Sequence, residues 1–151
     1  MAKNTSLSGF RKIDIDIYNP ENYNEDDVQN IQEDLMPNES EIVSLINSKR
    51  SNEALSLVLK NPPLNSKNQQ VKDAVLNLVM RVLRSFPNSL EIDNAVKSLS
   101  DEALDVLMKY IYRGFEKEPR DSAQLLTWHE KVYAIGGNGC IVRVLTDRKR
   151  V

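Results

Sequence analysis

The chain has very few of the residues on which catalytic and metal sites depend. Its 151 residues include one cysteine, Cys140, and one histidine, His129. A single cysteine excludes an internal disulfide framework. Zinc sites need three or four His, Cys or carboxylate ligands, and one histidine with one cysteine does not make such a set. The sequence therefore predicts no metal site, no cofactor and no enzymatic activity.

A nucleophilic Cys/His pair is the one catalytic arrangement that these two residues allow. Cys140, however, lies between Gly139 and an apolar run, a position typical of a small buried thiol. His129 follows Trp128 on a predicted helix and is expected to bond a backbone carbonyl or a partner protein. A hydrolase that uses Cys140 remains an alternative, which loss of activity in Cys140→Ser would reveal.

Long apolar runs are also missing. No run approaches the roughly 20 residues of a membrane-spanning helix, and the first six residues lack the apolar stretch of a signal peptide. We therefore expect a soluble, cytoplasmic protein. A domain of roughly 110 residues would bury about two-thirds of its unfolded surface, which is enough to fold without disulfides.

Basic residues are missing from one long stretch. Ten acidic residues and no basic one lie between Asp14 and Glu41, so that residues 1–41 carry a net charge of −7 and residues 42–151 carry +5. A highly charged segment with few apolar residues does not bury enough surface to fold. The sequence predicts an acidic, extended or disordered tail over residues 1–38 and a helical core domain over residues 39–151.

The tail contains one pattern that a purely solvated terminus does not need. Ile13, Ile15 and Ile17 alternate with polar residues, the period of a strand with one apolar face. No second alternating run follows, and an isolated strand is not stable in water. We therefore expect this segment to bind a partner in an extended form, with a solvated terminus as the alternative. The expected partner-binding residues are Phe10, Arg11, Lys12, Ile13, Asp14, Ile15, Asp16 and Ile17.

After Pro37 apolar residues recur at helical spacing. Asn38, Ser51 and Ser100 are predicted N-caps, and Gly136 with Gly137 is a predicted C-terminal cap. The fold class expected is all-α, an irregular, superhelix-like αα array of about seven short helices. The predicted helices cover residues 39–46, 51–60, 69–86, 90–99, 101–115, 121–135 and 141–146.

The same spacing predicts which side chains face the core. The stripe of residues 69–86 begins with Val71 and Ala74, and that of residues 101–115 contains Leu104, Leu107, Met108 and Ile111. In residues 121–135 the predicted core positions are Leu125, Trp128, Val132 and Ile135.

A cluster of cations lies near the end of the chain and consists of Arg143, Arg148, Lys149 and Arg150. Such clusters contact nucleic acid, anionic lipid or an acidic protein face. No aromatic residue interleaves this one, and a net charge of +5 is modest for a nucleic-acid-binding domain. Protein contact or solvation is the preferred interpretation, and we expect no nucleic-acid or membrane partner.

Six strings of the sequence are distinctive: FRKIDID (10–16), LKNPPLNSK (59–67), VKD (71–73), LMKYIYRGFE (107–116), LLTWHEK (125–131) and GGNGCIVRVLT (136–146). Together they resemble one family, subunit 5 (the 16-kDa subunit) of the actin-related protein 2/3 complex. Their order and spacing match along the chain, and the departure lies in the Asn-rich acidic stretch of residues 18–38.

The resemblance implies a non-catalytic structural subunit of an assembly that nucleates branched actin filaments in the actin cytoskeleton. It implies that the helical core docks against subunit 4 and the propeller subunit 1 of a hetero-oligomer. It also implies that the N-terminal tail reaches actin-related protein 2 through residues 10–17. A free-standing helical protein-interaction adaptor is the alternative, and it would purify alone as a stable monomer.

Overall fold

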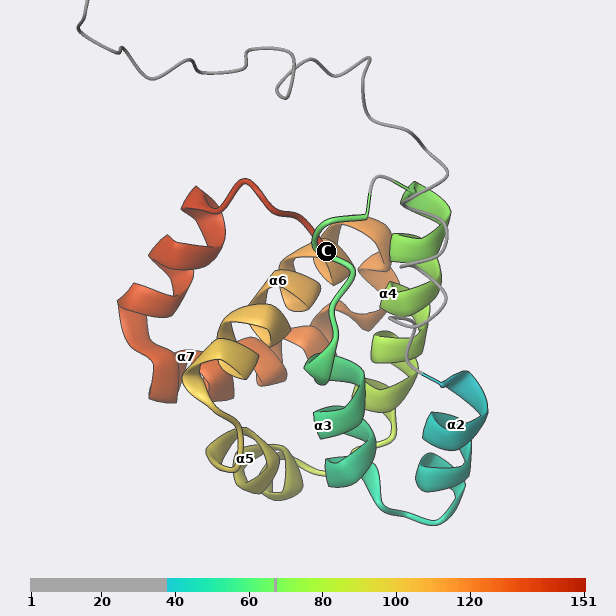
Figure 1. The fold of residues 1–151 in the computed structure, drawn as a ribbon. Helices are drawn as coiled ribbons and strands as arrows, with labels where there is room; N and C mark the ends of the chain where they lie inside the picture. The colour runs from blue at the N-terminus through green and yellow to red at the C-terminus, as the bar shows by residue number, and fades with distance from the viewer. Residues whose placement is uncertain (1–37, 67) are drawn as a thin grey trace, which may run out of the picture. The chain divides into compact units, whose positions relative to one another are not determined.

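A computed structural model describes residues 38–66 and 68–151, which form an all-α fold (Figure 1). Within those two ranges no β-strand is present, so the predicted fold class is confirmed. The expected tail contacts of residues 10–17 lie outside the described residues. The elements are α2 (Glu39–Asn47), α3 (Ser51–Lys60), α4 (Gln69–Arg84), α5 (Ser89–Lys97), α6 (Asp101–Lys117), the 3₁₀ turn η3 (Pro119–Asp121) and α7 (Ser122–Thr146).

The helix starts follow the predicted capping residues in part. The Ser100 hydroxyl accepts a hydrogen bond from the Ala103 backbone N–H at 3.3 Å, which is the N-cap bond expected for α6. Asn38 does precede α2, but its side chain accepts from the Ser40 hydroxyl and caps no backbone N–H. Ser51 is the first residue of α3 and not its cap, so that prediction was one residue off.

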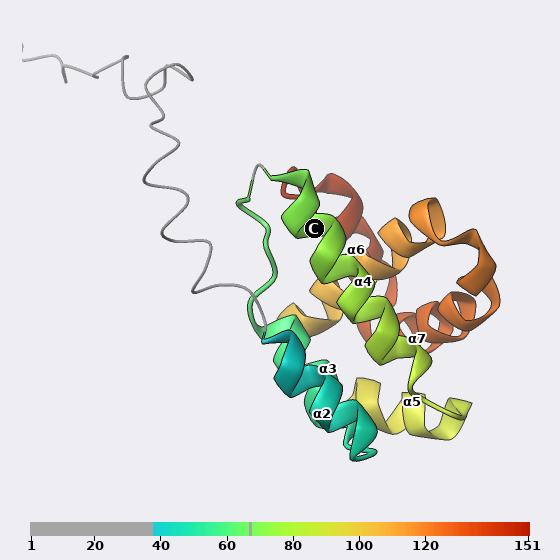
Figure 2. The ribbon, with the colours of Figure 1, turned by 90° about the vertical axis from the view of Figure 1, so that its right-hand side faces the viewer.

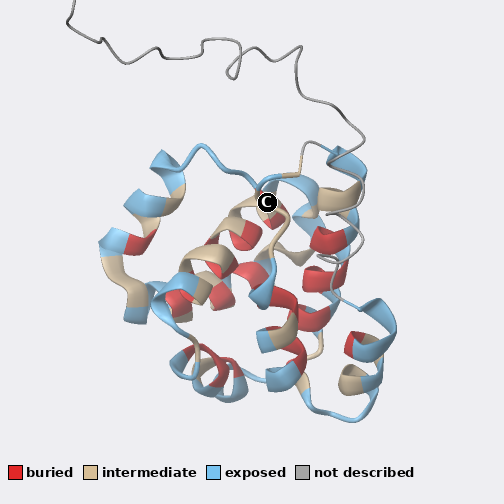
Figure 3. Ribbon diagram, in the orientation of Figure 1, coloured by how far each residue is buried: buried red, intermediate tan, exposed pale blue. Residues whose placement is uncertain are grey.

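The helices surround α6, which packs against α3, α4, η3 and, most extensively, α7. α2 and α3 form an antiparallel hairpin beside α4. Both views place α5 at the same end of the domain as the loop between α2 and α3 (Figures 1 and 2). Figure 3 shows the buried residues along the facing sides of these helices. The four predicted core residues of α6 are all buried, and Tyr110 on the same helix is buried with them.

The predicted core face of α4 was partly wrong. Ala74 is exposed and Val71 is only half-buried, whereas Leu76 and Met80, which lie off the predicted stripe, are 2% and 1% exposed. α4 packs against α2, α3 and α6, so neighbours cover it on more than one side. One amphipathic stripe describes a helix at the surface of a domain and underestimates a helix that lies between others.

Gly137 interrupts the helical geometry within α7, at the predicted C-terminal cap. Its φ of 59° and ψ of −164° are non-helical, but the chain resumes helical geometry at once, and α7 continues to Thr146. The segments predicted as separate helices over residues 121–135 and 141–146 are therefore present as two helical segments on either side of Gly137, and the second begins earlier than predicted. A positive φ is strained for residues with a Cβ, so the kink requires glycine at this position.

Gly114 allows the close approach of three helices at the centre of the core. A Cβ built on Gly114 would lie 2.9 Å from Leu125 Cδ1 of α7 and 3.1 Å from Met80 Sδ of α4. Leu125 and Met80 are both 1% exposed, so neither side chain has free space into which it could move. The distance between α6 and α7 at this point therefore depends on the absence of a side chain.

We predict that Gly114→Ala lowers the free energy of unfolding of the full chain by about 1–3 kcal/mol. Alanine favours helix over glycine by about 1 kcal/mol, but the methyl group would push Leu125 out of its packed position. Chemical denaturation measures the change. Gly139→Ala is the matched control, because its Cβ would meet only the flexible end of Arg143, at 3.1 Å. Equal stability of Gly114→Ala and the wild type would contradict this account of the packing.

Candidate protein-docking surface

Cys140 is fully buried and has no route to a substrate. Its thiol lies 3.9 Å from the Leu104 carbonyl oxygen, and burial, together with the Asp105 carboxylate, raises the pKa of the thiol to about 12. A thiol with so high a pKa stays protonated at neutral pH and is a poor nucleophile. The prediction of a small buried thiol is confirmed, and burial at this site argues against the hydrolase alternative.

His129 belongs to an aromatic cluster between α6 and α7. Its Nε2 lies 3.3 Å from the Tyr112 hydroxyl, and its ring stacks on Tyr133 with centroids 6.4 Å apart. The residue is structural, as predicted, but its partner is a tyrosine and not a backbone carbonyl. Among residues 38–66 and 68–151 no three His, Cys, Asp or Glu side chains gather in a way that could hold a metal ion.

Exposed large apolar side chains are concentrated on α7, on more than one side of the helix and on both sides of Gly137. Of the six large apolar residues that are strongly exposed in the described part of the chain, five belong to α7 and one, Leu90, belongs to α5. We define the α7 face by these five residues: Leu126 (59% exposed), Tyr133 (41%), Ile135 (44%), Val142 (58%) and Leu145 (68%). A concentration of exposed large apolar residues on one element makes that element a candidate protein-docking surface.

Ile135 was predicted to face the core, and that prediction was wrong. Helical periodicity places it on the same side as Leu125, Trp128 and Val132, which are buried. Periodicity identifies a side of a helix, but it does not say how far the neighbouring helices extend along it. Ile135 lies just before the Gly137 kink, where the core no longer covers that side.

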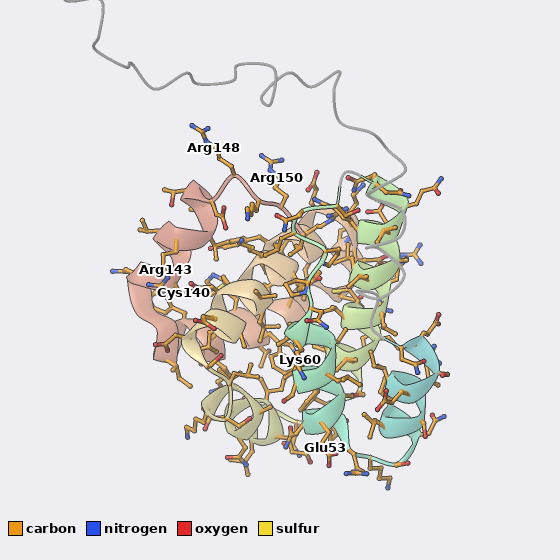
Figure 4. All side chains as sticks on the ribbon, viewed as in Figure 1. Glu53, Lys60, Cys140, Arg143, Arg148 and Arg150 are labelled. Atoms are coloured by element: carbon orange, nitrogen blue, oxygen red, sulfur yellow. The ribbon has the colours of Figure 1, made fainter. Side chains whose placement is uncertain are left out.

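Ion pairs between α6 and the second half of α7 fix how this face is presented. Arg143 donates two hydrogen bonds to the Asp105 carboxylate, at 2.6 and 2.9 Å, and Lys109 pairs with Asp147 just after the helix. Figure 4 places Cys140 and Arg143 together on this half of α7. A bidentate arginine–carboxylate pair fixes the relative orientation of its two side chains as well as their separation. It holds one side of α7 against α6 and leaves Val142 on the outside.

The Arg143 guanidinium holds the pKa of Asp105 below its usual range, with a smaller contribution from Lys109. In the same way, the side-chain hydrogen bond from Lys109 lowers the pKa of Asp147. Both carboxylates are therefore charged at neutral pH, and both ion pairs are formed. Ion pairs as well as apolar contacts therefore fix the orientation of α7.

The α7 face was not predicted from the sequence. The signal was present, because apolar residues are distributed around the whole circumference of α7, a composition typical of a helix covered on every side. In this chain only Leu125, Trp128, Val132 and Cys140 of α7 are buried. The predicted tail contacts, residues 10–17, lie outside the described residues. No described helix is long and apolar enough to cross a lipid bilayer.

Comparison with known proteins gives full-length matches. The profile of the family described as "ARP2/3 complex 16 kDa subunit (p16-Arc)" matches residues 9–151. Actin-related protein 2/3 complex subunits 5-B and 5-C of Xenopus laevis are 48% and 50% identical over 153 residues, covering all of both chains. A probable actin-related protein 2/3 complex subunit 5 of Caenorhabditis elegans is 35% identical over 144 residues, covering 94% of this chain and 97% of the relative.

We predict that Asp105→Asn destabilises the full chain by about 1 kcal/mol at pH 7 and that the difference shrinks below about pH 4. A carboxylate whose folded pKa is depressed contributes stability above its unfolded pKa, and the contribution is lost as the pH falls through the folded pKa. Denaturation of both proteins between pH 7 and pH 3 measures this.

Glu116→Gln is the control for Asp105→Asn, since Glu116 is exposed on the same helix and forms no ion pair within the described ranges. We expect it to change stability by less than about 0.5 kcal/mol at either pH. A constant difference between Asp105→Asn and the wild type across the pH range would mean that the Arg143 pair is not the cause.

Proposed function

Because this chain belongs to the family of the 16 kDa subunit of the ARP2/3 complex, we propose that it is a non-catalytic structural subunit of that complex. Its role would be to support the nucleation and branching of actin filaments, in the cytoplasm and at the actin cytoskeleton. The observation that carries the proposal is the α7 face, an apolar surface on a helix that is otherwise fixed to the core. A structural subunit needs a surface that its partner subunits can bind, and it does not need a reactive site.

The helical core would dock on other subunits of the complex through the α7 face, and the family resemblance suggests subunit 4 and the propeller subunit 1. Tyr133 and Ile135 lie before the Gly137 kink, and Val142 and Leu145 lie after it. Fully burying a side chain such as valine or leucine contributes about 1.5–3 kcal/mol. Burial of a few of these residues would therefore give a stable contact between subunits.

The N-terminal residues would add a second contact. Residues 10–17 carry the alternating apolar pattern, and an extended chain of 38 residues could span at most about 125 Å. A segment that binds actin-related protein 2 weakly becomes effective when core docking raises its local concentration. The charge of −7 over residues 1–41 would favour extension through self-repulsion, so we propose that this segment is a tether.

Two substitutions test the docking surface. We predict that Val142→Asp weakens incorporation of the full chain into the complex by at least about tenfold, because it places a charge in an apolar interface. Co-purification with the remaining subunits measures incorporation. Leu90→Asp is the matched control, since Leu90 is 70% exposed but lies on α5 and does not belong to the α7 face. Equal incorporation of the two variants would contradict docking through α7.

Deletion of residues 1–17 tests the tether. The truncated chain should join the complex as the full chain does, while filament nucleation or retention of actin-related protein 2 falls. Ile13→Asp combined with Ile15→Asp should reproduce the effect of the deletion, because the two charges disrupt the alternating apolar pattern of the segment. Asn22→Asp with Asn24→Asp adds the same charge outside the segment and should have little effect. If the truncated chain failed to enter the complex at all, the tether hypothesis would be wrong.

A further inference from the structure

An open pocket of about 420 Å³ lies between α4, α6, the end of α7 and residues 147–151. Its wall contains two acidic side chains, Glu116 and Asp147, and a larger set of cationic ones. The cationic residues are Lys72, Lys109, Arg113, Lys117, Lys149 and Arg150. They come from three separate elements, α4, α6 and the segment after α7, so the positive charge surrounds the pocket.

Two of the six cations are neutralised by partners within the fold. Lys109 pairs with Asp147, and its side chain is only 10% exposed. Arg113 donates to the Asp73 carboxylate of α4 at 2.5 Å and is 12% exposed. These two residues hold α4, α6 and the end of the chain together, and they contribute little free charge to the pocket.

The other four cations form no ion pair in the described ranges, although Lys117 lies near enough to Asp73, and Lys149 to Asp147, to lower the pKa of that carboxylate. Lys72 donates to the Arg150 carbonyl oxygen at 2.6 Å, which fixes its position without neutralising it. Lys117, Lys149 and Arg150 also form no ion pair with any described residue. Burial and the nearby Arg113 guanidinium both lower the pKa of Lys72.

The pocket is held in shape before any ligand arrives. Val151 is 2% exposed, and the Lys149 carbonyl oxygen accepts a hydrogen bond from Lys109 at 3.2 Å. Both views show the end of the chain lying beside α4 and α6 (Figures 1 and 2). Tyr112 and Val144 add an apolar wall against which the carbon atoms of a ligand could pack. Fixed donors reduce the ordering cost of binding.

We propose that this pocket binds a compact ligand with two or more phosphate groups, such as an inositol polyphosphate, either free or as a lipid headgroup. The volume lies within the usual range of small-ligand sites. Lysine and arginine form strong charge-assisted hydrogen bonds to phosphate oxygens. Four cations that form no ion pair, arranged around one cavity, match a compact polyvalent anion better than an acidic protein segment, which presents its carboxylates along a line. Leu145 of the α7 face also lines this pocket, so the proposed ligand site adjoins the docking surface.

Calorimetric titration of the full chain with inositol hexakisphosphate tests the proposal. Lys117→Gln combined with Lys149→Gln should raise the dissociation constant by about 100-fold, about tenfold for each charge-assisted contact removed. No other described residue uses either ammonium group in an ion pair, so the variant should keep the stability of the wild type. Inorganic phosphate should bind far more weakly than the polyphosphate because it engages fewer cations.

Lys60→Gln combined with Arg81→Gln is the matched control. It removes the same charge from exposed positions that do not line the pocket, Lys60 on α3 and Arg81 on α4. It should change the dissociation constant by less than about threefold, because charges farther away are screened by salt. If the control weakened binding as much as the pocket variant, the attraction would be a general property of the surface and the proposal would be overturned.

Vesicles distinguish the two sources of the ligand. Phosphatidylcholine vesicles with phosphatidylinositol bisphosphate should bind the wild type and not the pocket variant if the ligand is a lipid headgroup. Binding of the free polyphosphate without vesicle binding identifies a soluble ligand. The proposal is overturned if neither probe binds, or if the pocket variant loses incorporation into the complex while polyphosphate binding is unchanged. The latter result would identify the pocket as a contact for an acidic protein.

Discussion

The packing of α6 between α4 and α7 is the constraint on which the rest of the domain depends. Gly114 lets Leu125 of α7 and Met80 of α4 approach the α6 backbone, and the buried face of α6 continues from Leu104 to Ile111. Because interiors are packed as densely as organic crystals, a change in this spacing affects every helix that contacts α6. The short outer helices α2, α3 and α5 complete the core around this contact.

The charged residues of α6 then determine the surface. Asp105 and Lys109 hold the second half of α7 and the segment after it, so the apolar residues of α7 that do not fit against α6 must face outward. Arg113 and Lys117, one and two turns farther along the same side, face the end of the chain at the basic pocket. One helix therefore positions both the α7 face and the pocket, which explains how two surfaces of opposite character lie on the same small domain.

The chemistry of the domain agrees with a structural role in an assembly. The thiol is buried with a raised pKa, the histidine is engaged by tyrosines, and exposed large apolar side chains are concentrated on α7. These features are suited to contacts with other molecules. The family to which the chain belongs provides the assembly in which such contacts would form.

The sequence by itself determined the class of fold, the helix bounds within a few residues, and the family. Caps such as Ser100 and stops such as Pro62 act on the nearest turn of backbone, so they can be read locally. Tertiary structure decided that Ala74 and Ile135 are exposed and that Lys72, Lys117 and Lys149 surround one pocket. These outcomes depend on which helices lie next to each other, and periodicity along a single helix carries no information about its neighbours.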